Sequence, residues 1–146
     1  MRQIGRMNMK VVIIDGQGGK LGQKLSEAVS NSKVECELYA VGTNTVATSA
    51  MLKGGAEFAA TGENAVIVAC RDADVIIGPI GITVADSLLG EITPAMATAV
   101  GQSRALKLFL PVSHCNNQVV GVKNLSLSDM VEAAVEKLKD CGLCQK

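Results

Sequence analysis

The chain has very few aromatic residues, no excess of charge of either sign and no long apolar run. Of its 146 residues, two are Phe, one is Tyr and none is Trp, so aliphatic side chains must build the core. Fourteen basic residues balance fourteen acidic ones, whereas a protein that binds nucleic acid through its surface charge carries a basic excess. The longest apolar stretch, 75–85, is interrupted by glycine and proline and is too short to cross a membrane. The composition therefore argues against binding to nucleic acid or to a membrane.

Signals for export and for a metal site are also lacking. No apolar run follows the basic residues near the start of the chain, which favours a cytoplasmic protein. The five cysteines are an odd number and the chain has one histidine, so we expect reduced thiols and no metal. Cys141 and Cys144 alone have the Cys-x-x-Cys spacing of a redox or metal pair, and the sequence leaves their role open.

What the sequence does contain is a regular alternation of strand and helix patterns. The β-branched run 10–15 ends in glycine, which is typical of a strand that is buried on both faces of a parallel sheet. Further strands are expected at 37–41, 56–61, 74–78, 107–112 and 119–122, and helices at 21–29, 44–53, 63–70, 93–103 and from 126 onward. The alternation predicts a single α/β domain over residues 1–146, with a three-layer, Rossmann-like, doubly wound and mostly parallel sheet. Residues 1–9 are expected to form a loose arm and residues 140–146 a tail.

A glycine-rich turn between the first strand and the first helix is the sharpest local feature. It contains Gly16, Gln17, Gly18, Gly19 and Lys20. Main-chain N–H groups in such a turn, the positive end of the helix dipole and the lysine all attract an anion. We interpret the turn as a phosphate-binding site. The alternative is that the glycines only permit a tight turn and close packing of the helix.

The turn matches the fingerprint of dinucleotide-binding proteins only in part. Gly16, Gly19 and Gly22 fit a G-x-x-G-x-x-G spacing that resembles the one in extended short-chain dehydrogenases, but the Tyr-x-x-x-Lys pair of that family is absent. The second strand ends at Thr43 and Asn44, where a dinucleotide-binding protein has an acidic residue for a ribose. We expect these two side chains to contact ligand hydroxyl groups. NAD(P) and a mononucleotide are both compatible with the turn.

A second glycine corner, made by Gly78, Pro79 and Gly81, follows the fourth predicted strand. Ligands of doubly wound sheets bind outside the carboxyl ends of the strands, so we expect this corner to form the opposite wall of the site. A turn that reverses the chain explains it equally well.

Two residues are candidates for acid–base chemistry, Asp86 and His114. Asp86 lies in the otherwise apolar segment 84–89, where a partly desolvated carboxylate would suit proton transfer; a helix cap or an ion pair is the alternative. His114 follows the fifth strand, although loop histidines more often bond to the backbone or to water. Further carboxylates near predicted turns belong to Asp15, Glu63 and Glu91.

Six segments together resemble an uncharacterised bacterial family of small Rossmann-like proteins, a domain of unknown function. They are IDGQGG (14–19), GTN (42–44), ATSAMLK (47–53), ATGENA (60–65), IGPIG (77–81) and ADSLLGEITP (85–94). The resemblance extends from Met9 to the last helix. It implies a Rossmann-like fold in a bacterial cytoplasm and assigns no catalytic residue.

The sequence thus predicts a small cytoplasmic protein that binds a nucleotide or another phosphorylated metabolite at the glycine turn. Two alternatives stay open: a non-catalytic homo-oligomeric scaffold or interaction protein, and an enzyme that uses Asp86 or His114 for acid–base chemistry. An apolar, aromatic-poor chain of this length also predicts a homo-oligomer.

Overall fold

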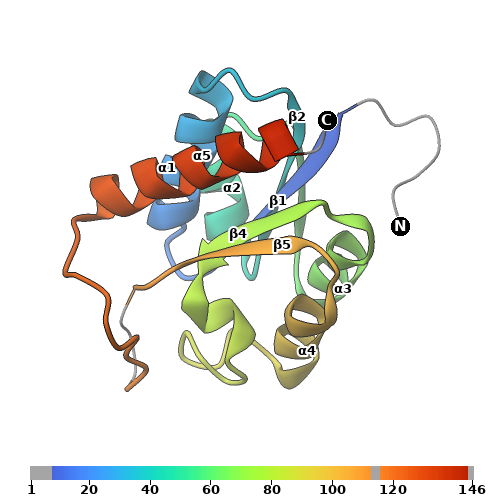
Figure 1. Ribbon diagram of the computed structural model, residues 1–146. Coiled ribbons are helices and arrows are strands. Elements are labelled where there is room, and N and C mark those ends of the chain that lie inside the picture. The colour runs from blue at the N-terminus through green and yellow to red at the C-terminus, as the bar shows by residue number, and fades with distance from the viewer. Residues whose placement is uncertain (1–7, 113–115, 145–146) are drawn as a thin grey trace.

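Five parallel strands form the sheet of the computed structural model, which describes residues 8–112 and 116–144. The strands are β1 (Met9–Asp15), β2 (Cys36–Gly42), β3 (Phe58–Thr61), β4 (Val75–Pro79) and β5 (Leu106–Leu110), in the order β3-β2-β1-β4-β5 (Figure 1). The chain starts at the centre of the sheet, winds outward to one edge, and then returns to build the other half. This order confirms the predicted doubly wound, Rossmann-like α/β fold.

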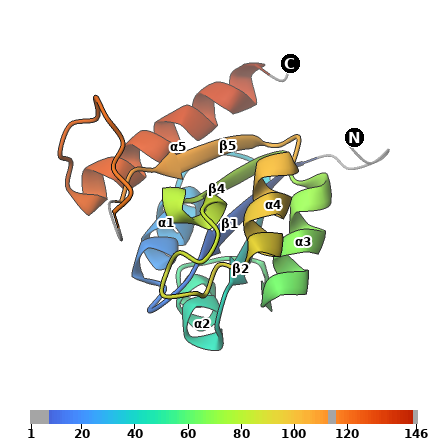
Figure 2. The same cartoon turned by 90° about the horizontal axis from the view of Figure 1, so that it is seen from below.

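Helices cover both faces of the sheet and complete three layers (Figures 1 and 2). One face packs against α1 (Lys20–Asn31), α2 (Thr45–Lys53) and α5 (Leu127–Cys144), and the other against α3 (Glu63–Asp72), the 3-10 turn η1 (Ile80–Thr83) and α4 (Pro94–Gln102). The helices predicted at 63–70 and 93–103 are confirmed as α3 and α4.

The central strand β1 supplies side chains to both cores. Val11 and Ile13 pack with α1, α2 and α5, whereas Val12 and Ile14 pack with α3 and α4, and all four are 0% exposed. Because alternate residues of a strand face opposite sides, a strand covered on both faces must be apolar throughout. This requirement explains the uninterrupted aliphatic run in the sequence, and it fixes the carboxyl end of β1, where the glycine turn begins.

Polar side chains cap three of the helices at their amino-terminal ends. Asn44 Oδ1 accepts from the Ala47 N–H at 2.9 Å before α2, and Thr93 Oγ1 accepts from the Met96 N–H at 3.2 Å before α4. Ser126 Oγ accepts from the Asp129 N–H at 3.1 Å before α5. Each cap satisfies a main-chain donor that has no partner within its own helix.

The structure differs from the sequence-based prediction in three segments. No strand forms at 119–122, since no described strand pairs with this segment, and Val120 in it is 96% exposed. Met9, expected in the arm, begins β1 and is buried, and α5 continues to Cys144, into the expected tail. Residues 1–7, 113–115 and 145–146 lie outside the described residues.

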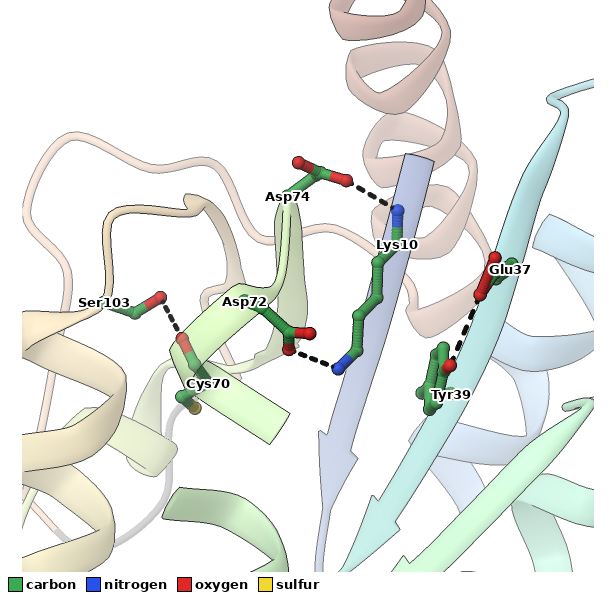
Figure 3. A network of polar contacts seen from close by, with 7 residues as sticks. All are labelled: Lys10, Glu37, Tyr39, Cys70, Asp72, Asp74 and Ser103. Carbon is green, nitrogen blue, oxygen red and sulfur yellow. Dashed lines mark hydrogen bonds and ion pairs between the residues drawn. The ribbon is translucent and has the colours of Figure 1, made fainter. Parts of the chain in front are cut away.

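A buried lysine ties the amino-terminal ends of the central strands together (Figure 3). The Lys10 ammonium lies 2.5 Å from Asp72 Oδ1 and 4.5 Å from the centre of the Tyr39 ring, and its main-chain N–H donates to Asp74 at 2.7 Å. Only 8% of Lys10 is exposed, so the ion pair and the aromatic face offset the cost of removing its charge from water. Because Lys10 lies near the start of β1, this network is remote from the glycine turn at the end of that strand.

Candidate functional site

The glycine turn folds into a tight connection between β1 and α1. The Gly19 N–H donates to the Gly16 carbonyl at 3.0 Å, and the Gln23 N–H donates to the Gly19 carbonyl at 2.8 Å as α1 begins. Gly19 is the N-cap residue of α1 and has left-handed backbone angles, with φ at 73°. A glycine adopts this conformation without steric cost, but it has no side chain to cap the helix.

Three main-chain donors of this turn have no acceptor within the part of the chain that the structure describes. They are the N–H groups of Gly18, Lys20 and Leu21. The next donor, the Gly22 N–H, is taken by Asp15 Oδ2 at 2.6 Å. The start of α1 therefore presents unbonded N–H groups at the positive end of the helix dipole, an arrangement that favours an anion.

A pocket of about 220 Å³ opens beside these donors. Its walls are the turn itself, Asp15–Leu21, and four side chains brought from other elements, namely Pro79, Leu88, Val112 and Leu127. The pocket thus combines polar main-chain groups on one side with apolar side chains on the other.

The glycines of the turn do not all serve the same purpose. A Cβ atom on Gly19 would lie 2.6 Å from Ala47 Cα, and one on Gly22 would lie 2.7 Å from Met51 Sδ, so packing of α1 against α2 explains both. A Cβ atom on Gly18 would meet nothing within 4 Å. Close packing therefore accounts for the G-x-x-G-x-x-G spacing, whereas the bare backbone at Gly18 borders the pocket without a packing reason.

The carboxylate of Glu91 occupies the space between the glycine turn and the end of β2. Its Oε1 atom accepts from the Gln17 N–H at 2.8 Å, from Thr43 Oγ1 at 2.5 Å and from Asn44 Nδ2 at 2.9 Å. A Cβ atom on Gly16 would lie 2.9 Å from this oxygen, so Gly16 permits the approach. Thr43 and Asn44, which we expected to contact ligand hydroxyl groups, hold a carboxylate of the protein itself.

An unusual turn before α4 delivers Glu91 to this position. Asp86, Leu88, Leu89 and Gly90 all have positive φ, at 67°, 55°, 55° and 88°. For residues other than glycine this conformation costs about 1–3 kcal/mol each, so surrounding contacts must hold it. Part of that support comes from the apolar core, since Leu88 is 6% exposed.

The two carboxylates near the turn have opposite pKa shifts. Burial raises the pKa of Asp15, and the nearby charge of Glu91 adds to the increase, while N–H groups of Gly22 and Gly16 oppose it. Partial burial would also raise the pKa of Glu91, but the hydrogen bonds from Thr43, Gln17 and Asn44 outweigh it and lower the pKa. The ionised form of Glu91 therefore stabilises the fold, whereas ionisation of Asp15 opposes it.

Replacing Glu91 with glutamine should destabilise the protein in a pH-dependent way. We expect a loss of about 1 kcal/mol near neutral pH, because charge-assisted hydrogen bonds become neutral ones and the site is partly screened by solvent. A lowered pKa gives stability that is present above the ordinary glutamate value of 4.5 and is lost as the pH falls through the folded-state value. Urea unfolding of both proteins between about pH 7 and pH 3 measures the difference, which should shrink on acidification. A difference independent of pH would contradict this assignment.

The structure separates the other residues singled out in the sequence. Pro79 lines the pocket, but Gly78 is buried in β4, and Gly81 borders a different crevice of only about 10 Å³. Asp86 is exposed, not desolvated, and does not line the pocket. His114 lies outside the described residues.

The thiols of Cys36 and Cys70 are poor nucleophiles, and no metal-ligand cluster occurs among the described residues. Burial raises the pKa of Cys36 to about 11 and that of Cys70 to about 11, so both remain protonated at neutral pH. Within the described part of the chain, no group of three or more His, Cys, Asp or Glu side chains is placed to hold a metal ion.

A larger hollow of about 680 Å³ lies between α3 and α4, on the opposite side of the sheet from α1. It is lined mostly by apolar and small side chains, together with Arg71 and Arg104. We place the candidate site at the glycine turn because unbonded main-chain donors and a lysine converge there.

Sequence reasoning missed the role of Glu91. It recognised an acidic residue near a turn, but no spacing in the sequence relates Glu91 to Gln17 or to the end of β2. The available signal was indirect: Thr43 and Asn44 are hydrogen-bond donors at a place where an acidic residue was expected, and donors of this kind are suited to hold a carboxylate brought from elsewhere.

Together, the fold and the turn define a doubly wound α/β protein in which the first main-chain donors of α1 are unbonded at the carboxyl edge of the sheet. A family model described as "Domain of unknown function (DUF3842)" matches residues 10–142, and the chain belongs to this family. This match confirms the resemblance to a family of unknown function. Searches of curated proteins and of solved structures find no significant match. No helix in the described ranges has the length and apolar character needed to cross a membrane.

Proposed function

We propose that the protein binds a small phosphorylated metabolite at the glycine turn. The phosphate group would accept hydrogen bonds from the N–H groups of Gly18, Lys20 and Leu21. The observation that carries this proposal is that these donors have no acceptor within the described residues and border a pocket. Exposed N–H groups at a helix start, where the dipole is positive, favour a phosphate.

The charge at the end of the turn where α1 begins supports an anionic ligand. The Lys20 side chain is exposed, lines the pocket and forms no ion pair within the described residues. The Gln17 N–H already donates to Glu91, so the unbonded N–H groups that follow it in the chain are the ones left for a ligand. A phosphate is therefore expected at the Lys20 end of the turn.

The size of the pocket favours a phosphorylated sugar or a mononucleotide over NAD(P). Pockets for drug-sized ligands occupy roughly 300–1,000 Å³, and this one has about 220 Å³. In a dinucleotide-binding protein the ribose lies beside the end of the second strand. Glu91 brings a carboxylate to that place, where Thr43 and Asn44 hold it. The small volume of the pocket is therefore the observation that argues against a dinucleotide.

Replacing Gly18 with valine should abolish binding while preserving the fold. The new side chain would meet no protein atom within 4 Å of its Cβ, and it would add bulk at a residue that lines the pocket. We expect the affinity for ribose 5-phosphate and for inorganic phosphate to fall at least about tenfold, with a corresponding loss of ligand-induced thermal stabilisation. Isothermal titration calorimetry and thermal unfolding measure the two effects.

Gly101→Val is the matched control, because Gly101 in α4 also has open space where a Cβ would lie and is remote from the turn. It should bind both probes as the wild-type protein does. Equal binding by Gly18→Val and the wild-type protein would reject the turn as the site.

The position of Asp86 supports ligand binding over acid–base catalysis by this residue, since its side chain is exposed and does not line the pocket.

The expected homo-oligomer stays a prediction. Self-association through the sheet edge would cover Phe58, which is 47% exposed on the edge strand β3.

A further inference from the structure

We propose that the hollow between α3 and α4 is the surface through which two copies of this chain associate, with their α3 helices antiparallel. This inference does not depend on the phosphate site, and it assigns a surface to the homo-oligomer expected from the sequence. The hollow measures about 680 Å³, and apolar or small side chains line most of it, among them Ile67, Ala95 and Ala99. A second copy would remove this apolar surface from water.

The two helices that form the hollow lie side by side and are joined at both ends (Figures 1 and 2). At the start of α4, Thr93 Oγ1 donates to Glu63 Oε1, at the start of α3, at 2.6 Å. After the other end of α4, Ser103 Oγ donates to the carbonyl of Cys70, in the last turn of α3, at 2.8 Å (Figure 3). The starts of both helices therefore lie together at one end of the hollow, and their carboxyl ends lie together at the other.

The two ends of the hollow carry opposite charges. The Glu63 carboxylate lies between the starts of the two helices, where its bond to Thr93 places it. Arg71 and Arg104 line the hollow at the other end, and both are exposed. Glu63, Arg71 and Arg104 form no ion pair within the part of the chain that the structure describes. The surface therefore presents an acidic end and a basic end to a partner.

A two-fold axis that crosses the helices pairs these opposite ends. Glu63, Ile67 and Arg71 are spaced at i, i+4 and i+8, so they follow one another along one side of α3. With the axis at Ile67, Glu63 of each copy faces Arg71 of the other, because each lies four residues from the axis. An axis parallel to the helices would instead bring the arginine ends of both copies together and align the helix dipoles. The charges therefore select the antiparallel arrangement, in which both copies use the same surface.

The free edge of β3 is a weaker candidate for this contact. The strand has four residues, and a short edge strand adds few main-chain hydrogen bonds to a partner. None of its residues, Phe58–Thr61, is charged, so the side chains of this edge do not fix the orientation of a second copy by charge. The hollow between α3 and α4 combines apolar surface with such an orienting feature.

Charge reversal tests the pairing on the full chain, with the dimer dissociation constant measured by sedimentation equilibrium. We expect the wild-type protein to be dimeric at micromolar concentration in low salt. Arg71→Glu and Glu63→Arg should each raise the dissociation constant at least about tenfold, because each variant places like charges together at both ends of the interface. Lys137→Glu is the matched control, since it reverses an exposed charge on α5, which covers the other face of the sheet. Its dissociation constant should stay within about threefold of the wild-type value.

An equimolar mixture of Arg71→Glu and Glu63→Arg should associate again. One variant then has acidic side chains at both positions and the other has basic ones, so opposite charges meet at both ends of a mixed dimer. We expect the mixed dimer to be within about threefold of the wild-type dimer in affinity, and this recovery also shows that both variants fold.

The wild-type protein alone provides two further tests. A monomer at micromolar concentration in low salt overturns the inference, and so does a dimer whose affinity is unaffected by added salt, because salt screens exposed charges. A dimer that neither reversal weakens overturns it as well and would place the contact on another surface, such as the β3 edge. A mixture that associates no more tightly than the separate variants rejects the pairing of Glu63 with Arg71.

Discussion

Replacing Gly78 with alanine is expected to destabilise the protein by about 3 kcal/mol, the upper end of the usual range for overpacked cores and a large share of the roughly 5–15 kcal/mol that keeps a small domain folded. A Cβ atom at this position would lie 2.5 Å from the main-chain oxygen of Ile14 and 2.9 Å from Ile82 Cδ1. Ile14 belongs to β1, which pairs with β2 on one side and β4 on the other. Because β1 is held on both sides, it cannot move aside, and the strand pairing itself must be disturbed.

Gly18→Ala is the control, since it also adds one methyl group to a glycine near the carboxyl edge of the sheet but meets open space. Its free energy of unfolding, from urea denaturation followed by circular dichroism, should stay within about 1 kcal/mol of the wild-type value. If Gly78→Ala were as stable as the wild-type protein, close packing would not explain why residue 78 is a glycine. The prediction that this residue forms a wall of the ligand site would then regain support.

Truncation of Leu138 to alanine should cost about 3 kcal/mol, within the range for leucine side chains in well-packed cores. Leu138 is 0% exposed and lies on α5, where it packs in one cluster with Leu25 and Val29 of α1. The loss should appear as a lower midpoint of urea unfolding with an unchanged slope.

Comparing Leu138→Ala with a variant at an exposed position of the same helix tests whether α5 is an integral part of the fold. Lys137→Ala changes the neighbouring exposed side chain on the same helix and should alter stability by no more than about 0.5 kcal/mol. If Leu138→Ala were as stable as Lys137→Ala, α5 would contribute little to the core, and Leu127 at its start would be an unreliable wall of the pocket.

Much of the fold was predictable because its signals are local. The aliphatic run of β1 predicted a strand buried on both faces, and the helix expected at 93–103 is present as α4. The segment 119–122 misled the prediction for a non-local reason: valine favours strands, but a strand also needs a neighbour, and the sequence does not show which strand edge is accessible.

The candidate site was predictable only in part. A glycine turn after β1 was visible in the sequence, and so was its position at the start of α1. The sequence did not distinguish Gly19, which packs against Ala47, from Gly18, which faces open space. Both are glycines in one turn, and only the position of α2 separates their roles.

By itself, the sequence determined the class of fold, the order of its first five strands with the helices between them, and the position of the glycine turn before α1, because each follows from residues close together in the chain. Only the tertiary structure decided which donors of the turn are unbonded and what occupies the end of β2. Glu91 is 74 residues from Gln17 in sequence, and their hydrogen bond exists because the chain returns to the same sheet edge after β4. Contacts of this kind depend on how the layers pack, which local patterns do not encode.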